Sequence, residues 1–232
     1  MSLTATDEDV AMHFNRQGVD CELGQIAKWW VEHSVDFVGK GLPTANKGII
    51  LNSRILWFFS EIALRQNNPT FNSLATRAFN YLIEHFDDTE NGGAYWELAF
   101  DGSVVETKKQ TYAQCFCIYA LCSYFRLTGD PAALEKALVY FQLVEKHARD
   151  ATCGGYIEAF SQDWKSISDY RLSEKDLNVP KSMNTHLHVL EAYSALYQVH
   201  KCVQTEEALR HVIEVFQYHI VCHKTTHLKL FF

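Results

Sequence analysis

The sequence lacks long apolar runs and an excess of basic residues. No uninterrupted hydrophobic stretch in its 232 residues reaches transmembrane length. Residues 1–9 (MSLTATDED) do not follow the basic-then-apolar order of a signal peptide. Scattered Lys and Arg total 21 against 28 acidic residues, for a net charge of -7. These features argue against nucleic acid and membranes as partners, and they make the cytoplasm the expected compartment.

Metal-type cysteine pairs and nucleotide-binding loops are also missing. The seven cysteines show no zinc-type pair spacing. On a helix, Cys115 and Cys117 would point about 200° apart. With Cys122 they fall in one apolar segment, so we expect three small buried side chains. The sequence has no Gly-rich phosphate loop, no serine nucleophile elbow and no parallel-sheet pattern.

Two classes of helical segment alternate along the chain. The first class is apolar nearly all round and must be covered on most sides; its members are residues 50–64, 111–127 and 183–199. The second class is amphipathic; its members are residues 72–86, 131–147 and 206–218. The segment 131–147 has the clearest start, with Asp130 as N-cap and Pro131 at the first helical position.

Glycine pairs separate these helical hairpins. Gly92-Gly93 and Gly154-Gly155 each precede a short aromatic segment, which predicts a tight turn into a strand. Asp101-Gly102 is a plausible hairpin turn after the first copy. Such an array closes into a toroid or extends as a solenoid, with loops on one rim around a pocket. We therefore predict an all-α domain over residues 1–232, with short β-hairpins between helical hairpins.

The segment 184–191 combines polar and titratable side chains with an apolar helix. Asn184, His188 and Glu191 are spaced i, i+4 and i+7 and would share one face. His186 lies about 200° from His188 on the wheel and would point elsewhere. A buried stripe of amide, imidazole and carboxylate costs stability unless it is hydrogen-bonded. It is therefore either a satisfied core network or a functional site.

Four motifs, in order, resemble those of the N-acylglucosamine 2-epimerase family, and most closely its cellobiose 2-epimerase branch. They are residues 47–60 (KGIILNSRILWFFS), 92–97 (GGAYWE), 108–114 (KKQTYAQ) and 181–193 (KSMNTHLHVLEAY). The resemblance runs from about Trp29 to the last residue. It implies a fold of the (α/α)6 barrel type.

Two departures from the family pattern accompany this resemblance. Residues 35–43 lack the Gly-Gly-aromatic turn that usually precedes the first Lys-Gly motif. The chain also stops within what resembles a strand motif of the fourth unit. We therefore expect an incomplete toroid, truncated on its C-terminal side. The two further catalytic histidines of the family would lie in the absent half.

The resemblance implies reversible inversion at C2 of a reducing-end sugar through an enediolate. Arg54 would donate to the enediolate oxygens, Tyr112 would contact the sugar, and Asn184 would hold a hydroxyl. His188 would move a proton or stabilise the intermediate. This chemistry requires no metal or cofactor, and the partner is a mono- or disaccharide of cellobiose or N-acylhexosamine type. We expect Arg54, Tyr112 and His188 to converge on a common cavity at the centre of the ring of helices.

Other functions and other roles for these residues remain open. The same intermediate would serve an aldose–ketose isomerase, and the chain could instead be an inactive carbohydrate-binding fragment. Exposed barrel edges would favour self-association. Arg54 could simply pair with Glu61, Tyr112 could be ordinary core, and Glu191 is more plausible as a structural carboxylate than as a base.

Two residue groups have a further possible role. The histidines His219, His223 and His227 are spaced for one helical face and could in principle bind metal. We expect the helix to end before His227, which disfavours that site. The tryptophans could stack on sugars but at helical and strand positions are more often core; these are Trp29, Trp30, Trp57 and Trp96.

Overall fold

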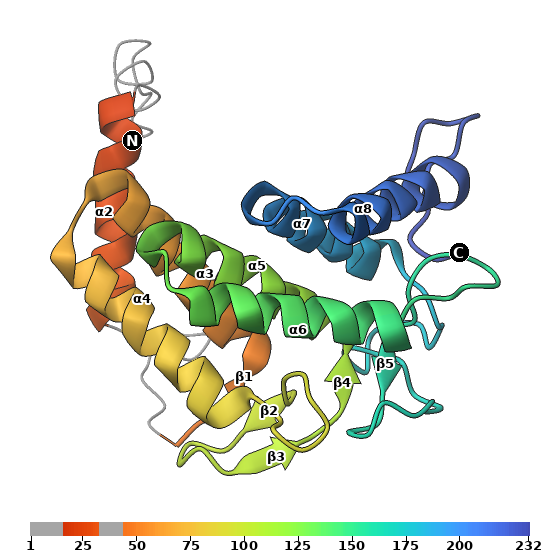
Figure 1. Ribbon diagram of the computed structural model, residues 1–232, viewed down its shortest axis with the longest axis horizontal. Helices are drawn as coiled ribbons and strands as arrows, with labels where there is room; N and C mark the ends of the chain where they lie inside the picture. Colours follow the sequence, from red (N-terminus) through yellow and green to blue (C-terminus); the bar gives the residue numbers. More distant parts are fainter. Residues whose placement is uncertain (1–15, 33–43) are drawn as a thin grey trace, which may run out of the picture. The chain divides into compact units, whose positions relative to one another are not determined.

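The computed structural model describes residues 16–32 and 44–232 (Figure 1). The chain divides into two compact units, residues 1–45 and 46–232, which are described separately. In the first unit, α2 spans Arg16–Glu32. The sequence features at residues 1–9 and 35–43, and the side chain of Trp30, lie outside the described part. That the whole chain forms one domain stays a prediction.

In the second unit, six long helices alternate between an inner and an outer row (Figure 1). The inner helices are α3 (Ile49–Gln66), α5 (Thr111–Thr128) and α7 (Met183–Val199). The outer helices are α4 (Pro69–Tyr81), α6 (Pro131–His147) and α8 (Val203–Val215). Helix α5 packs against both α3 and α7, and each inner helix packs against the outer helix that follows it. This arrangement is an incomplete α/α toroid, as predicted.

Local sequence explains where the outer helices begin. The Asn68 side chain accepts a hydrogen bond from the Thr70 amide at 2.9 Å, and Pro69 occupies the first turn of α4. Asp130 and Pro131 start α6 in the same way, with a 3.0 Å bond from the Ala132 amide. Each cap stabilises its helix by about 1 kcal/mol.

Both α4 and α8 end in a wider π-helical turn. These turns are η1 (Leu82–Phe86) and η2 (Phe216–Ile220). Together α4 and η1 cover the predicted segment 72–86, and α8 and η2 cover 206–218. The sequence pattern located these helices but did not predict the change of helical type.

The core is centred on α5, which is buried on most sides. Cys115 and Cys117 are fully buried and Cys122 is 1% exposed, which confirms the prediction of small buried side chains. Burial raises the pKa of the Cys117 and Cys122 thiols to about 12, so they stay protonated at neutral pH. These cysteines occupy positions on α5 that need a small apolar side chain, which explains why cysteine is found there.

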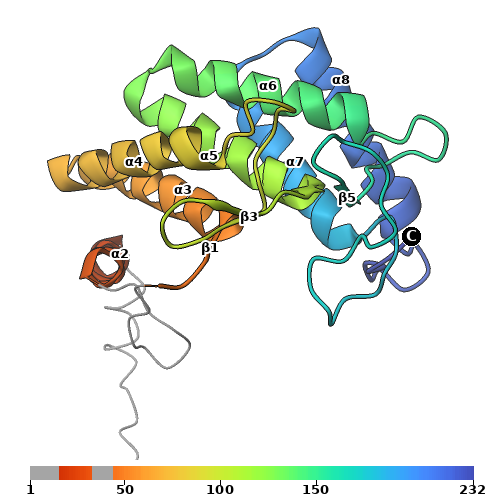
Figure 2. The same ribbon diagram turned by 90° about the horizontal axis from the view of Figure 1, so that it is seen from below.

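Short antiparallel strands link the helical hairpins. One sheet has the order β1–β2–β3, formed by β1 (Lys47–Gly48), β2 (Glu97–Leu98) and β3 (Val104–Glu106). The other pairs β4 (Lys109–Gln110) with β5 (Ala159–Phe160). Gly102 turns the β2–β3 hairpin with φ of 93°, which confirms the predicted Asp101-Gly102 turn. Figure 2 shows the strands gathered at one end of the helices, where α3 and α5 begin.

The Gly-Gly turns recur with the same backbone. Gly93 and Gly155 have φ of 78° and 76°, in the left-handed region that favours glycine. A Cβ at Gly93 would lie 2.9 Å from the Gln114 side chain, and one at Gly155 would lie 2.6 Å from the His186 ring. These turns therefore need glycine both for conformation and for space.

No helix in residues 16–32 and 44–232 is both long enough and apolar enough to span a membrane.

Candidate functional site

A repeat in the inner helices places the candidate site. Each inner helix starts two residues after a lysine: Lys47, Lys109 or Lys181. The seventh residue after each lysine is Arg54, Phe116 or His188, so these three occupy equivalent helical positions. The third residue after the lysine is Tyr112 in the second repeat and Asn184 in the third.

The three equivalent positions meet between the helices. The Arg54 guanidinium carbon lies 4.7 Å from the centroid of the Phe116 ring, in a cation–π contact. The centroids of the Phe116 and His188 rings are 4.5 Å apart. The Tyr112 ring lies 5.0 Å from Phe116 and 4.7 Å from His188. We call this group of Arg54, Tyr112, Phe116 and His188 the hub.

The hub is accessible on one side. Arg54 is exposed, and Tyr112 and His188 are half-buried, whereas Phe116 is buried beneath them. Burial raises the pKa of the Tyr112 phenol, against the opposing effect of the Arg54 charge, so the phenol is a neutral donor at pH 7. The structure brings Arg54, Tyr112 and His188 together as predicted, whereas a common cavity between them and their individual roles stay predictions.

Glu191 orients the His188 imidazole. Its Oε2 lies 2.6 Å from His188 Nδ1, which confirms that the two residues share a helical face. A proton on Nδ1, donated to this carboxylate, leaves the Nε2 lone pair of the neutral ring free to accept another. The Glu191 carboxylate thus supports His188, in agreement with the structural role expected for it.

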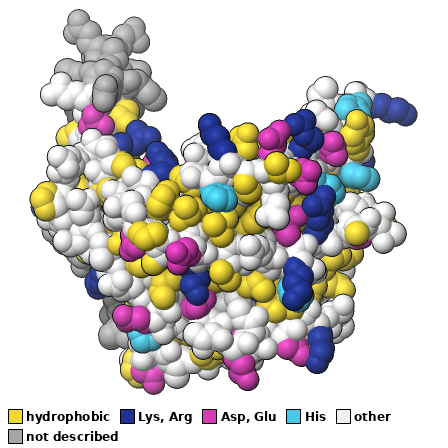
Figure 3. Space-filling model, viewed as in Figure 1, with side chains coloured by type: hydrophobic (Ala, Val, Ile, Leu, Met, Phe, Trp, Pro, Cys, Tyr) yellow, Lys and Arg dark blue, Asp and Glu magenta, His cyan; other side chains and the backbone are white. Residues whose placement is uncertain are grey.

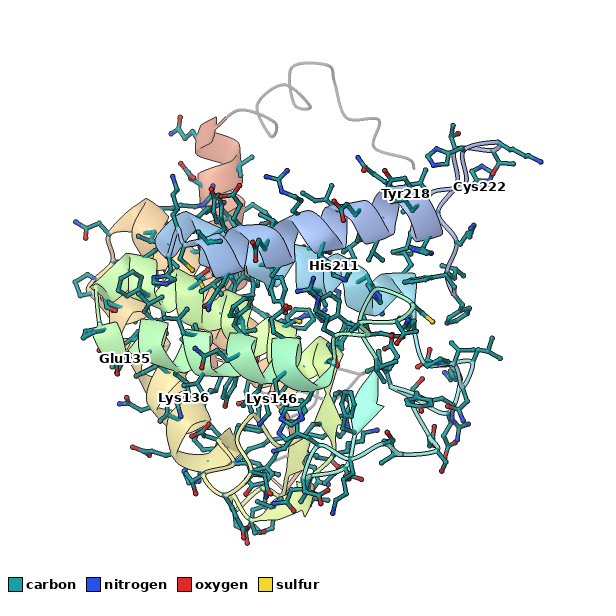
Figure 4. The ribbon with its side chains drawn as sticks, turned by 45° about the vertical axis from the view of Figure 1, so that its right-hand side comes forward. Glu135, Lys136, Lys146, His211, Tyr218 and Cys222 are labelled. Carbon is teal, nitrogen blue, oxygen red and sulfur yellow. The ribbon has the colours of Figure 1, made fainter. Side chains whose placement is uncertain are left out.

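His186 points away from the hub, as predicted. Its Nε2 accepts a hydrogen bond from the Tyr156 amide at 2.8 Å, and its Nδ1 lies 2.7 Å from the Ser182 carbonyl oxygen. Burial lowers the pKa of His186 to about 4, so the ring is neutral. His211 of α8, labelled in Figure 4, also accepts a bond, from the Gly155 amide at 3.3 Å. These imidazoles brace the Gly-Gly turn.

Asn184 lies apart from the hub contacts, one helical turn before His188. It is exposed and lines a cavity of about 360 Å³. Glu158, Tyr170 and Arg171 line the same cavity. Polar groups at the start of α7 therefore face open space that could receive a hydroxylated ligand.

The alternative reading of Arg54 as a partner of Glu61 is wrong. Glu61 Oε1 instead pairs with Arg126 Nη1 at 2.8 Å. Glu61 and Arg126 line a second hollow, of about 460 Å³, nearer the carboxyl ends of the inner helices. Trp57 also lines this hollow and stacks on Tyr119, with ring centroids 5.5 Å apart.

The histidine spacing near residue 220 does not produce a helical metal site. The helix was predicted to end before His227. It ends earlier, because η2 ends at Ile220, and both His223 and His227 lie beyond it. His223 Nε2 lies 2.8 Å from the Gln217 carbonyl oxygen. Within the part of the chain that the structure describes, no three His, Cys, Asp or Glu side chains are placed to hold a metal ion.

Sequence reasoning missed two residues of this region. Phe116 is an apolar side chain in an apolar helix, and only its spacing from Lys109 marks it as the equivalent of Arg54 and His188. Glu158 is buried, with 4% of its surface exposed. Its signal is a single carboxylate after the second Gly-Gly turn, at a position where the first copy has Trp96.

Comparison with known proteins gives consistent results. The family model for N-acylglucosamine 2-epimerase matches residues 32–232. The chain is 43% identical over 219 residues to the cellobiose 2-epimerase of Bacteroides fragilis. This match covers 90% of this chain and 56% of that protein. A D-mannose isomerase of Marinomonas mediterranea is a more distant relative, 23% identical over 149 residues, covering 64% of this chain and 34% of that protein.

Among solved structures, the cellobiose 2-epimerase of Spirochaeta thermophila matches with a TM-score of 0.84 and 34% identity. The match covers 93% of this chain and 57% of that protein. The chain thus spans about half the length of the relatives it matches. Its family model, sequence relatives and fold agree, and the chain belongs to the N-acylglucosamine 2-epimerase family.

Proposed function

We propose that this chain supplies one side of the active site of a sugar 2-epimerase. The enzyme would invert C2 at the reducing end of a cellobiose-type disaccharide or an N-acylhexosamine. The observation that carries this proposal is the hub, in which Arg54, Tyr112 and His188 come together around Phe116. The cellobiose 2-epimerase relatives support the disaccharide as the first substrate to test.

The chemistry of the hub suits proton transfer next to a carbonyl. The C2 proton becomes acidic once the sugar ring opens, because the aldehyde oxygen can take up charge as an enediolate. The Arg54 guanidinium would stabilise that charge, and the Tyr112 phenol would donate to a sugar oxygen. His188 Nε2 would accept a proton or donate one to the intermediate. Asn184 would hold a hydroxyl from the side of the cavity.

Epimerisation removes a proton from one face of C2 and returns one to the other face. Two proton carriers on opposite sides of the sugar are therefore needed. In the described residues, His188 is the imidazole at the hub. The family resemblance implies two further catalytic histidines, and we propose that such a group acts together with His188. If turnover requires those histidines and they are not available, the chain would bind the sugar without converting it, which is the alternative of an inactive carbohydrate-binding fragment.

Solvent exchange tests the proposal. Purified protein is incubated with cellobiose in D2O, with N-acetylmannosamine in a parallel reaction, and the products are followed by NMR. Deuterium at C2 together with the C2 epimer supports the epimerase. Sugar binding without turnover supports the binding fragment, and absence of both binding and turnover refutes the assignment to this site.

A second candidate is an aldose–ketose isomerase. The D-mannose isomerase relative favours it, and the same enediolate would form. In that reaction the proton returns to C1, so the product is a ketose. Exclusive ketose formation in the same experiment would select this function over epimerisation.

We also propose a place in cytoplasmic carbohydrate metabolism and association between copies. All seven cysteines are free thiols, which is typical of a reducing compartment. Large hydrophobic side chains are exposed, including Leu51, Val203 and Leu230 at 49%, 70% and 62%. Figure 3 shows hydrophobic side chains scattered between charged ones on one face. We infer that a second copy would make contact at the most exposed of these side chains.

A further inference from the structure

Glu158 occupies a position that recurs in the repeats. In each repeat, the backbone carbonyl at this position accepts a hydrogen bond from the first residue of an inner helix. The pairs are Ile49 N to Trp96 O at 3.1 Å, Thr111 N to Glu158 O at 2.8 Å, and Met183 N to Leu230 O at 2.8 Å. The backbone role is thus common to all three, whereas the carboxylate occurs only at Glu158.

The Glu158 side chain reaches the next inner helix. Its Oε1 accepts a hydrogen bond from the Ser182 amide at 2.7 Å, and its Oε2 accepts one from Thr185 Oγ1 at 2.5 Å. These donors flank Asn184 in the first turn of α7. In the described part of the chain, no basic side chain forms an ion pair with this buried carboxylate.

We propose that Glu158 is a positioning residue for the candidate sugar site, and that its protonation changes how firmly it holds the first turn of α7. Through that turn it sets the position of Asn184 and, one turn later, of His188. This inference deepens the proposed function and rests on it for the sugar. The contact between Glu158 and α7 can be tested without any sugar.

The two protonation states hold α7 differently. The carboxylate accepts both hydrogen bonds and places negative charge at the amino end of the helix, where the helix dipole favours it. A neutral carboxyl loses this attraction, and one of its oxygens becomes a donor. Burial raises the pKa of Glu158 to about 7, in spite of the bonds from Thr185 and Ser182, so both states are populated near neutral pH.

The other charged and titratable groups around Glu158 either have their own partners or do not change protonation state near neutral pH. On the loop, Arg171 Nε pairs with Asp169 at 2.8 Å, and Asp176 accepts from Ser173 Oγ at 2.9 Å. Tyr170 lines the cavity, and burial holds the Cys115 thiol of α5 protonated. Before α7, Lys181 pairs with Asp150 at 2.7 Å, and within α7 His186 faces the Gly-Gly turn.

NMR on the full chain tests the proposal. The amide signals of Asn184 and Thr185 are followed between about pH 5 and 9, a range that brackets the titration. We expect a midpoint near pH 7 and loss of this titration in Glu158→Gln, which keeps His188. The matched control is Glu135→Gln on the outer helix α6 (Figure 4), where the titration should persist. An unchanged titration in Glu158→Gln overturns the proposal.

Thr185→Val provides a second test if Glu158→Gln does not fold. It removes one donor to the carboxylate, so the midpoint should rise by about half a pH unit or more. A midpoint equal to that of the wild type overturns the proposal.

Measurements of cellobiose binding then test whether the contact between Glu158 and α7 affects the candidate sugar site. The wild-type affinity should weaken as the pH falls through the Glu158 midpoint, and Glu158→Gln should bind without that step. The same step in Glu158→Gln overturns the link to the site. If neither protein binds cellobiose at any pH, the proposed function fails, while the amide titration still decides the role of Glu158 in α7.

Discussion

At the scale of single residues, Arg54 carries the positive charge of the hub. Replacing it with Met keeps a long side chain but removes both the charge and the contact with the Phe116 ring. We expect cellobiose turnover by Arg54→Met to fall about a hundred-fold or more, because the proposed enediolate would lose its donor. Initial rates of deuterium incorporation at C2 measure this.

Arg126→Gln is the matched control for Arg54→Met. Its guanidinium pairs with Glu61 away from the hub, and the Arg126 side chain is 44% exposed. Turnover should stay close to that of the wild type. If Arg54→Met were as active as this control, Arg54 would have no part in stabilising the intermediate.

Glu158 also gives the protein a specific pH dependence of stability. Its pKa is raised from 4.5 in the unfolded chain to about 7 in the folded protein, mainly by burial. The folded state therefore binds this proton more tightly. Its net contribution to the free energy of unfolding is full below about pH 4.5 and is lost as the pH rises to about 7, on the order of 3 kcal/mol, because the cost of burying the charge outweighs the two hydrogen bonds that the carboxylate accepts from α7 and its N-cap.

Chemical denaturation of wild type and Glu158→Gln across this range measures the contribution. The difference between their free energies of unfolding should change between about pH 4.5 and 7 and be flat above about pH 8. Subtracting the two curves cancels the other carboxyls. A difference that does not vary with pH would mean that Glu158 is not the group that titrates.

At the scale of elements, the second Gly-Gly turn is the tightest point of the repeat. Gly155→Ala would combine a left-handed φ of 76° with a contact 2.6 Å from His186 Nε2. Gly129→Ala has φ of 71° but no neighbouring atom within 4 Å, so it isolates the cost of the backbone. We expect about 1 kcal/mol for Gly129→Ala and at least twice that for Gly155→Ala.

Thermal and urea unfolding of the two alanine variants test this comparison. Equal losses of stability would show that His186 moves aside freely and does not brace the turn.

The elements also show how far the sequence predicts the fold. The helices 131–147 and 183–199 were predicted with the bounds that the structure has. Asp130 and Pro131 account for the start of α6, because caps and periodicity are local properties. The π-turns were not predicted, because their widened hydrogen bonding has no signature in hydrophobic spacing.

The candidate site was only partly predictable for a related reason. Arg54 and His188 stood out as polar groups in apolar helices, whereas Tyr112 was predicted only from its place in a motif that resembles the family; the structure brings the three together. Phe116 and Glu158 did not stand out, because their importance comes from neighbours on other helices. The pairing of Glu61 with Arg126 rather than with Arg54 likewise depends on the approach of α5 to α3. The spacing of residues within one segment does not predict contacts of this kind with other helices.

At the scale of the whole molecule, exposed apolar side chains predict association between copies. We expect sedimentation to show species larger than a monomer. Leu51→Lys, on the inner helix α3, should reduce association, because Leu51 is 49% exposed. Val139→Lys is the control: Val139 is 43% exposed but lies on the outer helix α6. A monomeric wild type would refute this proposal.

The backbone bonds that join successive repeats also determine how the molecule comes apart. The first amide of α3, α5 and α7 is held by a carbonyl that comes 47 residues later in each case, at Trp96, Glu158 and Leu230. Each inner helix is therefore completed only when the following unit has folded. Unfolding of one repeat should consequently destabilise the inner helix of the repeat before it, so that unfolding spreads toward the amino terminus and reaches Arg54 of the hub last.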